Sequence, residues 1–147
     1  ERANADMRRS VLEKLVFVSA YNLVGAVNGG ITVGEVAQRH SDEVDAMCRE
    51  LASFIRYTLS VSLFSGLDER LNEYATKFEF LPTEIKDFEF RNGYFYKFSK
   101  LAGQRTNAAG IKVDVPDTTP IHTEYLLYAH EEKKIISKAL LDSVTLG

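Results

Sequence analysis

The chain has little cysteine, histidine or proline, and it has no excess of positive charge. Of its 147 residues, one is Cys, three are His and three are Pro, and 18 Lys and Arg face 21 Asp and Glu. A single thiol cannot form an internal disulfide, and with three scattered histidines it does not make a closed zinc site. A net charge of −3 argues against nucleic-acid or anionic-membrane binding. We therefore expect a cytoplasmic protein with no nucleic-acid partner, no membrane and no metal.

The sequence also lacks a long uninterrupted apolar run. Residues 15–27 follow Arg8-Arg9-Ser10 as the core of an export signal would, but this stretch has only thirteen residues, whereas a helix needs about 20 to cross a hydrocarbon core. Ser19, Tyr21 and Asn22 interrupt it. We interpret it as a buried helix. The chain begins with Glu1 rather than Met, and we expect it to be a piece of a longer protein.

Helical patterns fill most of the chain, separated by caps and breakers. Thr32 and Glu35 have the spacing of a capping box, which starts a helix. Pro82 disfavours the helical conformation of the residue before it, and Pro120 suits the first position of a helix. The pattern predicts a loop over residues 104–118 and six helices over residues 5–27, 32–40, 41–63, 67–81, 83–103 and 119–141. The sequence therefore predicts an all-α fold, a compact bundle of about six helices in which residues 1–147 form one domain.

Lys14 is the first candidate for chemistry, because it lies within an apolar stretch where few positions face solvent. We expect a half-buried lysine, and burial disfavours the charged ammonium, which makes lysine a better proton donor. Asn22 lies eight residues further on, about 12 Å along the helix axis, so both side chains can line one wide cleft. A lysine that reaches the surface and a structural asparagine are the alternative reading of these two residues.

Several short segments together carry a family resemblance. They are residues 12–17 with Lys14, Asn22, the Thr83-Glu84-Ile85 run within residues 81–87, Asn92-Gly93, residues 112–116 and Thr119-Pro120. In this order and spacing they resemble the C-terminal substrate domain of the ketopantoate reductase (2-dehydropantoate 2-reductase) family. The resemblance covers most of the chain, and it implies an all-helical bundle like those of 6-phosphogluconate dehydrogenase-like enzymes.

The resemblance implies an oxidoreductase of pantothenate biosynthesis that transfers a hydride from NADPH to a branched 2-oxo acid such as ketopantoate. Lys14 matches the family's catalytic lysine and acts as general acid, Glu84 matches its acidic partner, and Asn22 matches a substrate-binding asparagine. We expect Glu84 to lie in the first turn of the helix over residues 83–103, beside Thr83 as N-cap. The implied partners are a small 2-oxo acid, the family's N-terminal nucleotide-binding domain and a second copy in a homodimer.

The sequence departs from the family at several positions. Leu12 replaces a usual tryptophan, Val18 replaces a frequent second substrate-binding asparagine, and Asn72 takes the place of a carboxylate-binding serine. No GxGxxG follows a strand pattern, so the dinucleotide-binding domain is absent from this chain, the cofactor-binding residues are unknown, and we expect the chain alone to be inactive. Two alternatives remain open: the C-terminal domain of another 2-oxo-acid or 3-hydroxyacid dehydrogenase, and a non-catalytic helical interaction or dimerisation module.

We expect no chemical role for three further side chains. Cys48 falls on an apolar helical face, where we expect it to be buried and inert. His122 and His130 are eight residues apart on one predicted helix, too far for one metal ion, and we expect both on the surface.

Overall fold

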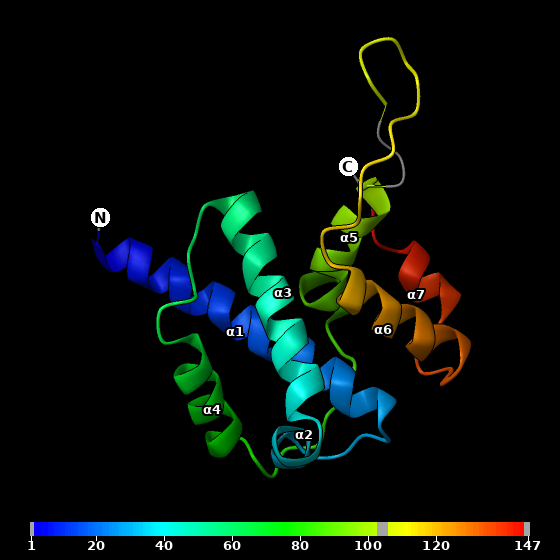
Figure 1. Cartoon of the computed structure of the whole chain (residues 1–147). Helices are drawn as coiled ribbons and strands as arrows, with labels where there is room; N and C mark the ends of the chain where they lie inside the picture. The colour runs from blue at the N-terminus through cyan, green and yellow to red at the C-terminus, as the bar shows by residue number, and fades with distance from the viewer. Residues whose placement is uncertain (1, 103–105, 146–147) are drawn as a thin grey trace.

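The computed structural model describes residues 2–102 and 106–145, and it confirms the all-α prediction (Figure 1). This part of the chain forms seven α-helices and one short 3₁₀ helix, with no strand. Helix α1 (Arg2–Val27) crosses the molecule behind α3 (Ser41–Leu59), with α2 (Val33–Arg39) and α4 (Leu67–Lys77) at one side. On the other side are α5 (Asn92–Ala102), α6 (Pro120–Glu131) and α7 (Lys138–Asp142).

Helix α1 is the central element, as the sequence predicted. Val16, Ala20, Leu23 and Val24 are fully buried, and α1 packs against α2, α3, α5 and α6. By length and composition α1 could also span a membrane, with a mean hydropathy of 1.4 over its most apolar window, and 56% of that window is buried in the fold. Helix α1 has 26 residues, twice the length of the apolar stretch over residues 15–27. The core helix of a folded protein and a signal sequence can both have this length and composition.

The chain turns sharply after α1 and continues into three helices close to their predicted positions. Gly29 and Gly30 have φ values of +95° and +75°, which glycine adopts without a steric penalty. The capping box of Thr32 and Glu35 is present at the start of α2. Helix α3 ends at Leu59 rather than near residue 63, because Ser60 adopts a left-handed conformation with φ of 58°.

The predicted helix over residues 83–103 is wrong in its first half. Residues 83–87 are irregular, a 3₁₀ helix η1 (Phe88–Phe90) follows, and α5 begins only at Asn92. Thr83 is not an N-cap: it is buried, and its hydroxyl donates a hydrogen bond to the Ile31 carbonyl at 2.6 Å. Gly25 allows this approach, since a Cβ there would lie 2.1 Å from the Thr83 hydroxyl oxygen. Tertiary contact with the α1–α2 turn thus replaces the local helix.

The predicted helix over residues 119–141 is two helices. Pro120 is at the start of α6 as expected. The helix ends at Glu131, Lys134 takes a φ of 57°, and Ser137 then caps α7 by accepting a hydrogen bond from the Leu140 amide at 3.0 Å. These breaks account for seven α-helices where six were predicted. Of the predicted loop, residues 104 and 105 lie outside the described residues.

Candidate functional site

A hollow of about 500 Å³ lies between α1, α4 and the segment from α4 to α5. Lys14, Asn22 and Glu84, three of the four predicted site residues, line it together. Asn72 does not: it lies in a separate shallow depression on α4, with Glu69 and Glu73. We call the first hollow the basic hollow, after its charged lining residues: Lys14, Lys77, Glu84, Lys86 and Arg91.

The expectation of a half-buried Lys14 is wrong. The Lys14 side chain is exposed, and its neighbour Glu13 is the buried charge, with a residue exposure of 2%. Successive residues of an α-helix point about 100° apart, so the helix face that buries Glu13 turns Lys14 toward the opening of the hollow. The ammonium of Lys14 therefore keeps its contact with water while it lines the basic hollow.

Glu13 and Arg70 fix α4 against α1 beside the hollow. Both Glu13 carboxylate oxygens accept hydrogen bonds from Arg70 Nε, at 2.7 and 2.8 Å. Arg70 also donates to the Leu63 carbonyl at 2.9 Å and to the Ser65 carbonyl, both in the segment that leads into α4. A charge-assisted bond to a buried carboxylate is stronger than a neutral one. The pair therefore sets the position of the α4 wall.

Asn22 and Glu84 are joined through the Glu84 backbone. The Asn22 side-chain oxygen accepts a hydrogen bond from the Glu84 amide at 3.1 Å, and its Nδ2 donates to the Val18 carbonyl at 2.8 Å. Glu84 is not in the first turn of a helix, since residues 83–87 are irregular, and its side chain is 65% exposed. Asn22 thus holds the Glu84 segment against α1, and its amide keeps one N–H and one lone pair for a ligand.

The segment that carries Glu84 is also pinned to the start of α2. The Val33 and Gly34 amides donate hydrogen bonds to the Leu81 and Glu79 carbonyls, each at 2.9 Å. The Thr83 amide donates to the Ile31 carbonyl at 3.1 Å. These bonds satisfy amides at the helix N-terminus that have no partner within α2. They also bring a residue far from α1 in sequence to the edge of the hollow.

Apolar side chains form the rest of the hollow's wall. The Phe17 ring lies 5.4 Å from the Tyr74 ring and 6.4 Å from the Phe78 ring, measured between centroids. Tyr74 and Lys77 on α4 and its C-cap residue Phe78 occur at i, i+3 and i+4, a spacing that places them on one face and could have identified this wall from sequence. The apolar lining residues are Phe17, Val18, Val33, Tyr74, Phe78, Leu81 and Pro82.

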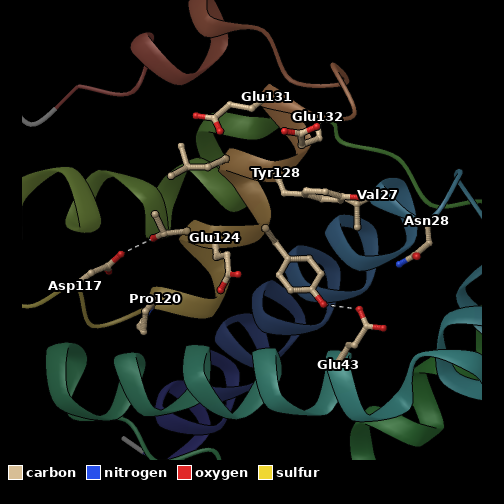
Figure 2. Close-up of a pocket in the computed structure, with 12 residues that line it drawn as sticks. Val27, Asn28, Glu43, Asp117, Pro120, Glu124, Tyr128, Glu131 and Glu132 are labelled. Atoms are coloured by element: carbon tan, nitrogen blue, oxygen red, sulfur yellow. Dashed lines mark hydrogen bonds between the residues drawn. The ribbon is translucent and has the colours of Figure 1, made fainter.

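A second hollow, of about 790 Å³, lies where α6 faces α3 and the end of α1 (Figure 2). Five carboxylates and two tyrosines are among its lining residues, and no Lys or Arg is. Glu43 accepts a hydrogen bond from the Tyr125 hydroxyl, and this bond, followed by the one from His40, lowers the pKa of the Glu43 carboxyl. We call it the acidic hollow; its carboxylates are Glu43, Asp117, Glu124, Glu131 and Glu132.

His122 is buried rather than on the surface as predicted, with a residue exposure of 0%. Asn92 Nδ2 donates to the Ser19 carbonyl at 3.0 Å and also lies 3.0 Å from His122 Nε2. An amide nitrogen is a donor, so Nε2 is the acceptor and Nδ1 carries the ring proton. Burial lowers the pKa of His122 from 6.5 to about 3. Asn92, predicted only as part of a motif, therefore links α1 to α6.

Gly93 and Cys48 have packing roles. A Cβ on Gly93 would lie 2.5 Å from the Phe88 carbonyl oxygen, so only glycine fits where α5 leaves η1. Cys48 is buried as predicted, and burial raises the pKa of its thiol, which leaves it inert. Neither residue lines one of the two large hollows.

Neither a metal-binding cluster nor a dinucleotide-binding motif occurs in the described residues. Residues 2–102 and 106–145 contain no group of three or more His, Cys, Asp or Glu able to hold a metal ion. They contain isolated bridges but no parallel sheet with a glycine-rich turn into a helix, the element that binds the pyrophosphate of a dinucleotide. The described residues therefore lack that pyrophosphate-binding motif.

Comparison of the chain with protein-family models, with curated proteins and with solved structures finds no match. The resemblance to ketopantoate reductase therefore stays a prediction. The two hollows are the features of the structure from which we infer a function.

Proposed function

We propose that the basic hollow binds a 2-oxo acid, and that this chain is the substrate domain of an NADPH-dependent 2-oxo-acid reductase of the ketopantoate reductase type. One observation carries the proposal: Lys14 and Asn22 on α1 line the same hollow as Glu84, which is 62 residues after Asn22 in the sequence. The hollow combines cations with an apolar wall, which suits a small carboxylate that has a branched apolar body.

In the proposed complex, the substrate carbonyl oxygen lies at Lys14. Reduction of a ketone leaves negative charge on this oxygen, and an ammonium stabilises that charge and then donates a proton. Because Lys14 is exposed, water can return the proton after each turnover. Asn22 orients the substrate through its remaining N–H, and Glu84, which lines the same hollow, is the proposed acidic partner of the Lys14 ammonium. The walls at Phe17 and Val18 receive the apolar part of the substrate.

NADPH supplies the hydride when it is bound, and the described residues lack the glycine-rich strand–turn–helix motif that would hold its pyrophosphate. The proposal therefore assigns the dinucleotide to a separate nucleotide-binding domain, and it assigns to this chain only substrate binding and the proton. The acidic hollow is a poor alternative for the substrate, since its five carboxylates repel an anion.

The test is turnover of 2-oxo acids by a protein that joins this chain to its nucleotide-binding domain. We expect Lys14→Gln to lower kcat for ketopantoate by about 100-fold, the usual scale for loss of a general acid. Circular dichroism should show unchanged helicity. Lys112→Gln, at another exposed lysine, is the matched control and should keep wild-type kcat. Turnover by Lys14→Gln at the wild-type rate, or no turnover of any 2-oxo acid by the wild type, would refute the proposal.

A further inference from the structure

Two of the four cations in the basic hollow have an acidic partner, and two do not. Lys86 Nζ lies 3.6 Å from the Glu84 carboxylate, and Arg91 lies 3.8 Å from the Asp87 carboxylate. Within residues 2–102 and 106–145, neither Lys14 nor Lys77 forms an ion pair. The chain has a net charge of −3, but the charged side chains that line the basic hollow are mostly positive. Lys14 and Lys77 are the two cations there that a ligand can pair with.

The two cations belong to different walls of the hollow. Lys14 is on α1, and Lys77 is the last residue of α4. Lys77 Nζ lies 5.6 Å from the Phe78 ring centroid, and that ring in turn lies 6.4 Å from the Phe17 ring, one turn after Lys14. An apolar surface therefore joins the two ammonium groups, which is the arrangement that a carbon chain with a charge at each end would match.

We propose that the substrate is an oxo acid with a second negatively charged group. Its 2-oxo acid end lies at Lys14, its carbon chain lies along Phe17 and Phe78, and its distal anionic group lies at Lys77. This inference rests on the proposed function: it keeps the 2-oxo acid end at Lys14 and names a dianionic oxo acid, rather than a monoanion such as ketopantoate, as the substrate that binds best. A ligand with one charge would not use Lys77, so Lys77 is the residue that determines the preference for a second charge.

The test compares 2-oxoglutarate with its 5-methyl ester, which keeps the 2-oxo acid end and lacks the distal charge. Affinities for the 147-residue chain are measured by calorimetry or NMR titration in about 20 mM salt. We expect the dianion to bind about fivefold more tightly, as one exposed ion pair allows, and the preference to shrink as salt screens the charges. Lys77→Gln should remove the preference without weakening the ester, and Lys112→Gln should retain it.

The outcomes separate this inference from the proposed function. Equal wild-type affinities for the two ligands, or a preference that survives Lys77→Gln, would overturn the inference. If both ligands bind equally and Lys14→Gln weakens both, the proposed function stands and only the inference fails. If neither of these ligands binds but ketopantoate does, only the inference fails. If ketopantoate does not bind either, or if Lys14→Gln changes none of the affinities, the proposed function fails and the inference fails with it.

Discussion

At the scale of one residue, the Asn22 side chain makes structural hydrogen bonds and still has groups that a ligand can use. Its oxygen accepts the Glu84 amide and its Nδ2 donates to the Val18 carbonyl, so both ends of the amide are engaged before any ligand arrives. What it offers a substrate is one N–H and one lone pair whose directions are already fixed. Asn22 therefore positions Glu84, and in the proposed complex it also contacts the substrate.

His122 gives a residue-scale prediction about stability and pH. Its pKa is about 3 in the folded protein and 6.5 in the unfolded chain, because burial disfavours the charged ring. Above pH 6.5 both states are neutral. As the pH falls below that value, only the unfolded state gains the proton, so the free energy of unfolding should fall by about 1.4 kcal/mol per pH unit. Urea denaturation at about pH 7.0, 6.0 and 5.5 measures this slope.

His122→Gln is the comparison variant for this prediction, since it removes the titrating ring. The difference in slope between the two proteins isolates His122 from carboxyls such as Glu50, whose pKa is raised by burial. An independent readout is the NMR signal of the imidazole ring in the folded wild type. A His122 resonance that titrates with an ordinary pKa would contradict the account.

At the scale of elements, the sequence was informative where a helix is stabilised locally. The capping box at Thr32 and the proline at the start of α6 were both predicted and confirmed. The same local rules failed at Thr83, whose hydroxyl donates to Ile31 rather than capping a helix. No pattern near residue 83 shows this contact, because its partners precede it by about fifty residues.

The candidate site shows the same limit. That Lys14, Asn22 and Glu84 line one hollow agrees with the sequence interpretation, but the half-buried Lys14 on which it depended is wrong. Glu13 and Lys14 are adjacent on a helix that is apolar almost all round, so periodicity could not decide which one faces inward. Arg70 decides it, because its guanidinium supplies the ion-pair partner for the buried Glu13 carboxylate.

The Glu13–Arg70 pair gives the element-scale prediction, because it holds α4 on α1. Arg70→Met should cost about 3–5 kcal/mol, since it leaves the Glu13 carboxylate buried without a partner. Glu13→Gln should cost less, about 1–2 kcal/mol, because the Arg70 side chain is 37% exposed and can be solvated. Urea denaturation of both variants measures the order. An Arg70→Met variant no less stable than Glu13→Gln would contradict the role of the pair.

At the scale of the whole molecule, charge is divided between two hollows of opposite sign. The basic hollow lies between α1, α4 and the Glu84 segment, and the acidic hollow lies between α3, α6 and the end of α1. A uniformly acidic surface would repel an anionic substrate, whereas this division gives an anion one favourable place to bind. We therefore predict that an anionic substrate binds to this chain, and that it binds in the basic hollow.

Mapping the binding of ketopantoate by NMR on the isotope-labelled 147-residue chain tests that claim most directly. We predict shifts in the backbone amide signals of Asn22 and Glu84, and unchanged signals for Glu124 and Glu131 on the acidic hollow. Lys14→Gln should weaken the response without moving the spectrum of the free protein elsewhere. Shifts centred on Glu124 and Glu131, or no shift at Asn22 and Glu84 at a saturating concentration, would contradict the account.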